Sequence, residues 1–225
     1  MGLRDTVMNR LVIPGVRRAT PEASGKVARL AFGKAVDGIG PLTPAATYAE
    51  RRLQKAGGNV DQAITDIIRD HTRLAAAEGF ATNIGGLATR AALVPANVLG
   101  IAVLQCRMVA GIAHLRGYDL KDTRVRTSIF ATMLGPKTVR QLMSNKKLPS
   151  RPRDIATGPK LDERTSNQIA AAVTGEIMAR AAGRSTATFV GRSIPGLGGV
   201  IGGTTDGWTT RQIGKYARKE HTRLA

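Results

Sequence analysis

The sequence predicts an all-α protein, a single multi-helix domain with closely packed helices rich in Gly and Ala. Two observations indicate this class. Apolar residues recur three or four positions apart along most of the chain, and no convincing alternation of apolar and polar residues marks a strand. Aromatic residues make up only 4% of the chain, while 26 of its 225 residues are glycine. A hydrophobic core with this composition is built from small side chains, which let helices approach closely.

The chain is expected to divide into a basic N-terminal helical arm, residues 1–43, and a helical domain, residues 44–225. Periodicity and the positions of proline and glycine delimit the helices. The expected helices span residues 5–13, 21–37, 45–56, 59–78, 95–116, 123–134, 136–144 and 161–182, with a short helix or helical hairpin over 80–93 and a final helix within 189–223.

Several helix ends carry specific signals. The glycine pair at 57–58 is expected to end one helix as a C-cap, and Asn59 or Asp61 is expected to cap the next. Pro95 suits the first turn of the most apolar helix. Residues 146–159 hold three prolines and several basic residues, so an exposed loop is expected there.

The formal net charge is +18, and the pI is about 11.3. Residues 59–120 carry as many acidic as basic residues, so the excess lies in the flanks. A charge of this size favours nucleic acid, an anionic membrane surface or an acidic protein as partner. The densest basic stretch is interpreted as an anionic-lipid contact, a nucleic-acid contact or a solvated surface, although it lacks aromatic residues for stacking. Its residues are Lys137, Arg140, Lys146, Lys147, Arg151 and Arg153, with Lys160.

No catalytic or metal-binding pattern is present. One cysteine, Cys106, excludes an intrachain disulfide, and three scattered histidines are too few for a metal site. Residues 191–195 only approach a hydrolase elbow, because proline replaces its last glycine. His71 is interpreted as part of a polar helix face on which Asp66 and Asp70 pair with neighbouring arginines. The sequence therefore predicts a non-enzymatic protein without metal or cofactor.

Arg107 stands out because it interrupts an apolar helix. Isoleucine, valine, leucine and methionine surround it in residues 101–112. A charge on a buried face needs a partner, for which Asp206 is favoured and Asp119 is the alternative. The other interpretations are an exposed stripe and a ligand-binding polar pocket that includes Gln105.

Glycines four residues apart occur near the C-terminus. On a helix they would lie along one face and allow another helix to pack closely. The competing interpretations are a flexible loop and a phosphate loop, but a Gly-Lys-Ser/Thr sequence and a preceding strand are both missing. The expected helix-packing glycines are Gly198, Gly199, Gly202 and Gly203, in line with Gly207, together with Gly85 and Gly86.

An ordered set of short strings resembles the EcsC family of bacterial proteins. The resemblance runs from about Ala45 to Ala217 and leaves residues 1–43 outside. It implies a helical protein associated with a membrane or close to lipid, and it implies no known reaction. The strings are FATNIGGL at 80–87, PAN at 95–97, QCRM at 105–108, IA at 112–113, GYDL at 117–120, IPGLGGVIGG at 194–203, Asp206, TT at 209–210, IG at 213–214 and Ala217.

We therefore expect a cytoplasmic protein that lies peripherally at the inner membrane and binds anionic lipid or a membrane partner. The start of the chain lacks a signal peptide, and the uncharged run Ala91–Cys106 is shorter than the roughly 20 residues of a membrane span. The alternative is a basic binding module for nucleic acid or an acidic protein. A second alternative is an enzyme with a polar pocket around Arg107. The oligomeric state is left open.

Overall fold

The structure is a computed structural model that describes residues 29–30, 32–38, 42–84, 87–176 and 197–224. These residues form helices joined by turns and loops, with no sheet, which confirms the all-α class. Residues 32–37 and 163–176 are also helical. The named helices are α3 (Ala45–Lys55), α4 (Val60–Ile84), α5 (Leu87–Leu115), α6 (Thr123–Met133), α7 (Gly135–Ser144), α8 (Pro152–Thr157) and α10 (Leu197–Glu220).

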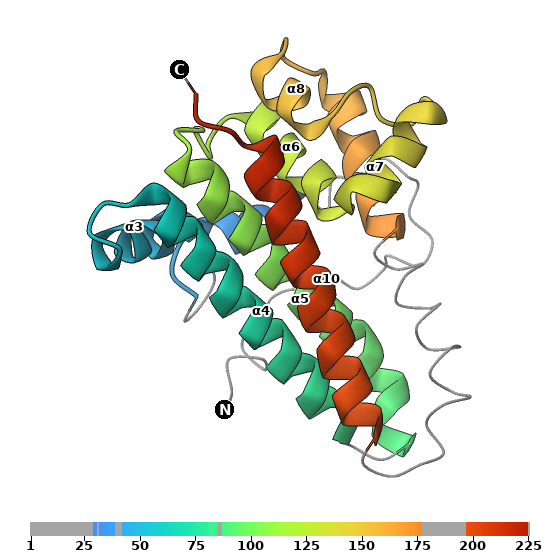
Figure 1. Ribbon diagram of the computed structural model, residues 1–225. Helices are drawn as coiled ribbons and strands as arrows, with labels where there is room; N and C mark the ends of the chain where they lie inside the picture. The colour runs from blue at the N-terminus through green and yellow to red at the C-terminus, as the bar shows by residue number, and fades with distance from the viewer. Residues whose placement is uncertain (1–28, 31, 39–41, 85–86, 177–196, 225) are drawn as a thin grey trace.

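Three long helices, α4, α5 and α10, lie side by side and form the body of the molecule (Figure 1). α3 packs against one end of α4 and α5, and α6, α7 and α8 gather around the C-terminal end of α10. The core runs through all of these layers and is built mainly from aliphatic side chains of α4, α5 and α6. Apolar burial along the three long helices is therefore the main source of stability.

Two glycines let α10 approach α4 closely. A Cβ added to Gly207 would lie 3.1 Å from the Ala76 Cβ, and one added to Gly214 would lie 2.9 Å from the Ile68 Cγ1. Because α10 numbers rise as α4 numbers fall along this contact, the two helices are antiparallel. The sequence analysis had placed Gly207 in line with the expected helix-packing glycines. It did not predict Gly214, two turns further on, as a packing position.

For the other predicted packing glycines, the structure describes the backbone of some and none of the others. Gly198, Gly199, Gly202 and Gly203 are helical residues of α10, which overturns the loop interpretation of this run. The packing contacts of these four glycines lie outside the described part of the structure. Gly85 and Gly86 lie outside the described residues.

The α3–α4 boundary has the predicted caps. Gly57 and Gly58 adopt φ angles of +61° and +83°, a region that favours glycine, and the Gly58 N–H donates to the Leu53 carbonyl. The Asn59 side chain accepts from the Gln62 N–H at 3.0 Å, so Asn59 is the residue that caps α4.

Residues 80–84 end α4 and residues 87–93 begin α5, as the helical-hairpin interpretation of 80–93 predicted, but the predicted bounds of the two long helices were wrong. α4 continues past Glu78 to Ile84, and α5 already begins at Leu87, so Pro95 lies inside α5 rather than in its first turn. An interior proline removes one backbone hydrogen bond and costs about 3 kcal/mol. Tertiary packing outweighs this local penalty, because every residue from 101 to 113 of α5 is buried.

The segment 146–159 is not wholly a loop. Residues Pro152–Thr157 form α8, with Pro152 in the first turn, where its missing N–H carries no penalty. Ile155 and Ala156 are buried in the core, and α8 packs against α6. The basic residues of this segment therefore stand on a firmly packed scaffold.

Part of the predicted N-terminal arm belongs to the same core. Phe32, Ala35 and Val36 are buried, and the Phe32 ring centroid lies 5.6 Å from that of Phe130. The Asp37 carboxylate accepts from the Arg126 guanidinium at 2.6 Å. Residues 1–28 lie outside the described part of the chain.

Within the described residues, no helix is long and apolar enough to span a membrane.

Candidate functional site

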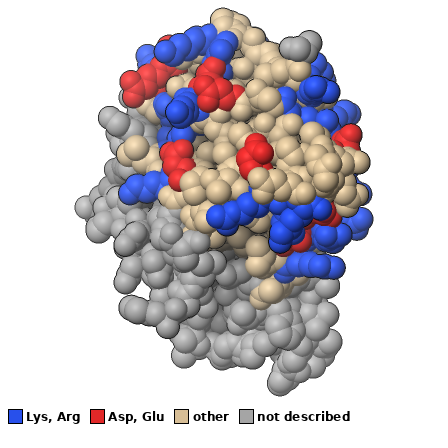
Figure 2. All heavy atoms as spheres, turned by 90° about the vertical axis from the view of Figure 1, so that its left-hand side faces the viewer, with Lys and Arg blue, Asp and Glu red and all other residues tan. Residues whose placement is uncertain are grey.

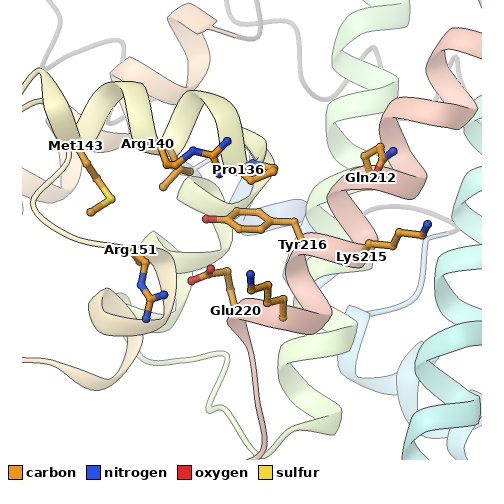
Figure 3. A pocket seen from close by; sticks show the side chains of 10 residues that line it. Pro136, Arg140, Met143, Arg151, Gln212, Lys215, Tyr216 and Glu220 are labelled. Carbon is orange, nitrogen blue, oxygen red and sulfur yellow. The ribbon is translucent and has the colours of Figure 1, made fainter.

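A groove of about 490 Å³ opens between α7, the N-terminal end of α8 and the C-terminal half of α10 (Figure 3). Its wall combines apolar side chains with a rim of cationic ones. The lining residues are Pro136, Val139, Arg140, Met143, Arg151, Gln212, Lys215, Tyr216, Lys219 and Glu220.

α7 supplies the apolar wall. Gly135 adopts a φ of +76°, which lets the chain turn directly from α6 into α7, and Pro136 follows in the first turn. Val139 is buried, while the next residue, Arg140, is exposed at the rim. α7 is thus amphipathic, and its boundary between the apolar and the polar side lies at the groove.

α10 supplies the opposite wall through two pairs of residues four apart. Tyr216 and Glu220 are buried, whereas Lys215 and Lys219 are exposed at the rim. Burial, together with the nearby Glu220 carboxylate, raises the Tyr216 pKa well above its usual range. The same carboxylate accepts from the Arg153 backbone N–H at 3.3 Å. Glu220 therefore ties α8 to α10 at the floor of the groove, next to the Tyr216 ring (Figure 3).

The groove carries an excess of positive charge. Four cationic side chains line it against the single carboxylate of Glu220. Within the described part of the chain, Arg140, Lys215 and Lys219 form no ion pair, and Arg151 approaches Asp154 only to 3.5 Å. An anion that enters the groove would therefore meet three cations without an ion pair, beside the single carboxylate of Glu220.

Several charges on other parts of the surface are paired. Figure 2 shows Lys and Arg next to Asp and Glu on the side of the molecule that carries α3. Arg52 pairs with Asp70 at 2.6 Å, and Arg116 pairs with Asp61 at 2.7 Å. Arg218 also contacts Asp61, and these two guanidinium groups hold the Asp61 pKa below its usual range.

Only part of the basic stretch predicted from sequence reaches the groove. Lys137, Arg140, Lys146, Lys147, Arg151 and Arg153 are all exposed, but only Arg140 and Arg151 line it. Sequence reasoning missed the contribution of α10. The recurrence of lysine at 215 and 219, one helical turn apart, was the available signal.

Arg107 is buried, with 5% of its surface exposed, but its surroundings differ from the prediction. Its Nη2 donates to the Thr43 Oγ1 at 2.9 Å, and its guanidinium lies over the Tyr48 ring. Its Nη1 is buried without a hydrogen-bond partner, and desolvation lowers the Arg107 pKa. Neither Asp119 nor Asp206 forms an ion pair with it.

Helix geometry explains why the proposed polar group is dispersed. Gln105 and Arg107 are two residues apart, so they point to nearly opposite sides of α5. Gln105 donates to the Thr210 hydroxyl of α10 at 3.1 Å, while Arg107 faces α3. Asp206 is buried in α10, and Asp119 is exposed in the turn before α6, where it accepts from the Lys121 N–H.

His71 was wrongly assigned to a polar face. It is buried between α3 and α4, its Nδ1 lies 2.9 Å from the Ile67 carbonyl, and its ring meets the Tyr48 ring edge to face. Burial lowers its pKa to about 4, so it is neutral at pH 7. Asp66 pairs with Arg69 as expected.

A second buried histidine meets a serine. The His221 Nε2 lies 3.0 Å from the Ser128 Oγ, and both residues are fully buried. A serine beside a histidine can act as a nucleophile with its base, but only when a substrate can reach the hydroxyl. Here the pair is closed off and joins α10 to α6, so we assign it to the core.

The fold and the groove together define a class, an all-α protein that offers a positively charged surface groove. A family model described as the EcsC protein family matches residues 58–224. Because this is more than half of the chain, the protein belongs to the EcsC family. Comparisons with curated proteins and with solved structures find no match.

Proposed function

We propose that this EcsC-family protein is a non-enzymatic binding protein of the cytoplasmic face of the inner membrane. In this proposal it docks on anionic lipid through the α7–α10 groove and the exposed basic residues around it. The observation that carries the proposal is the composition of the groove, in which a cationic rim adjoins an apolar wall.

This composition matches the chemistry of an anionic lipid. A phosphate-bearing headgroup would meet Arg140, Arg151 and the two lysines of α10, and the adjoining glycerol region would meet Pro136 and Met143. Each basic residue near an anionic bilayer contributes on the order of 1 kcal/mol. Lys137, Lys146 and Lys147, all exposed, would add to this attraction outside the groove.

The alternative partner is nucleic acid or an acidic protein. A nucleic-acid backbone would use the cationic rim but not the apolar wall. Exposed aromatic side chains, which stack on the bases of single strands, are also missing from the groove, since Tyr216 is buried. Both features favour lipid.

Vesicle sedimentation tests the proposal. The protein should sediment with vesicles that contain phosphatidylglycerol but not with pure phosphatidylcholine, and added salt should release it because the charges are exposed. The triple variant Arg140→Gln/Lys215→Gln/Lys219→Gln should weaken binding by about 3 kcal/mol, on the order of a hundredfold.

A matched control removes the same charge elsewhere. Arg51, Lys55 and Arg73 are exposed on α3 and α4, so the triple glutamine variant of these residues changes the net charge equally. It should retain most of the binding. Equal losses in both variants would mean that only net charge matters, and equal binding to neutral vesicles would exclude electrostatic docking.

A further inference from the structure

The single tryptophan of the chain is exposed on α10. Trp208 has 64% of its surface accessible, the largest value among the exposed apolar side chains of the described residues. An indole combines a large apolar surface with one N–H donor, so it is favoured where an apolar phase meets water. The position of Trp208 relative to the groove is therefore relevant to the orientation in which the protein would bind a bilayer.

Trp208 lies on the same face of α10 as the groove. Positions 208, 212, 215 and 219 are spaced by four, three and four residues, which places them in one stripe along the helix. All four side chains are exposed, and Gln212, Lys215 and Lys219 line the groove. The stripe is about 16 Å long at 1.5 Å per residue.

Another side of α10 is fixed by close packing. Gly207 rests against Thr72 and Ala76 of α4, and Gly214 rests against Ile68 and Met108. These contacts leave no freedom for α10 to rotate, because even one added methyl group would be crowded. The helix therefore holds Trp208 toward solvent in line with the two lysines.

We propose that this stripe is the membrane-contacting edge of the protein, with α10 lying along the bilayer plane and Trp208 inserted at the headgroup level. This inference rests on the proposed function. It adds the orientation of the protein on the bilayer and names Trp208 as the residue that anchors it. Lys215 and Lys219 would direct their ammonium groups to lipid phosphates, while their methylene stems cover the same apolar boundary as the indole.

The alternative occupant of this stripe is a nucleic acid stacked on Trp208. Strand-binding surfaces present several aromatic side chains to successive bases. Along the stripe from 208 to 219, Trp208 is the one exposed aromatic side chain among the described residues. A single indole between cationic side chains suits a bilayer interface better.

Because Trp208 is the only tryptophan, its fluorescence reports on this site in the unmodified protein. Vesicles with phosphatidylglycerol should shift its emission to the blue, and lipids brominated near the headgroup should quench it more than lipids brominated deep in the chain. Inorganic phosphate, as the soluble source of the same anion, should leave the emission unchanged.

Substitutions complete the test in a sedimentation assay. Trp208→Ser should lose at least tenfold in vesicle affinity, equivalent to about 1.4 kcal/mol, while Trp208→Phe should retain most of it. Leu74→Ser is the matched control, because Leu74 is also exposed but lies two residues from both Thr72 and Ala76, on the side of α4 turned away from α10. It should bind like the wild type.

The outcomes separate this inference from the proposed function. Sedimentation with anionic vesicles without an emission change would overturn the stripe and leave membrane docking intact. Absence of sedimentation would overturn both. An emission change with an oligonucleotide but not with vesicles would assign the stripe to nucleic acid.

Discussion

The guanidinium carbon of Arg107 lies 5.2 Å from the centroid of the Tyr48 ring, and this cation–π contact takes the place of the ion pair expected for a buried arginine. The Tyr48 hydroxyl donates to Asp70 at 2.9 Å, and Asp70 in turn pairs with Arg52. The ring of Tyr48 thus joins a buried cation of α5 to an ion pair between α3 and α4.

Arg107→Met is expected to leave the free energy of unfolding within about 1 kcal/mol of the wild type. The variant loses the ring contact and the bond to Thr43, but it also removes a desolvated charge whose Nη1 has no partner. Urea unfolding measures the change. Arg107→Ala should cost about 2–5 kcal/mol, because it leaves a cavity.

A double variant tests the ion pair predicted from the sequence. Since Arg107 faces α3 and makes no ion pair with Asp206, the effects of Arg107→Met and Asp206→Leu should add. A coupling energy above about 1 kcal/mol would show that the two residues interact in solution.

Gly214→Ala should destabilise the protein by about 1–3 kcal/mol through overpacking. The new methyl group would lie 2.9 and 3.0 Å from two carbons of Ile68 and 3.2 Å from the Met108 Sδ. Gly175→Ala is the matched control, because this helical glycine is exposed and has no atom within 4 Å of an added Cβ. There the better helix propensity of alanine should stabilise by up to about 1 kcal/mol, so thermal unfolding should move in opposite directions.

Stability should fall as the pH drops below about 6.5. Burial lowers the pKa values of His71 and His221 to about 4, whereas both titrate near 6.5 in the unfolded chain. Above pH 6.5 both histidines are neutral in the folded and in the unfolded chain, so they give stability no pH dependence there. Between about pH 6.5 and pH 4 only the unfolded state binds their protons, which costs up to about 1.4 kcal/mol per pH unit for each histidine.

Urea unfolding at pH 7, 6 and 5 measures this slope. His71→Phe keeps an aromatic ring beside Tyr48 and should remove about half of the slope. A wild-type stability that stays flat between pH 6.5 and pH 5 would show that the two histidines can be protonated in the folded state.

Local signals in the sequence were sufficient for several elements. The caps between α3 and α4 and the bounds of α6 and α7 follow from glycine, asparagine, aspartate and proline at helix ends, and short-range hydrogen bonds decide such ends. The EcsC resemblance and the all-α class also followed from the sequence, whereas the burial of Arg107 was one of the interpretations that it left open.

Tertiary packing decided what local rules could not. It carries α5 through Pro95 and folds part of a proline-rich segment into α8, because burial of long apolar faces outweighs local penalties of a few kcal/mol. It also separates Gln105 from Arg107, and it brings Arg140 together with Lys215, which are far apart in the chain.

Sequence alone determined the amount and sign of the charge and the small-residue helices. Only the tertiary structure placed cations of α7 and α10 around one groove, because that placement depends on which faces of these helices are buried in the core.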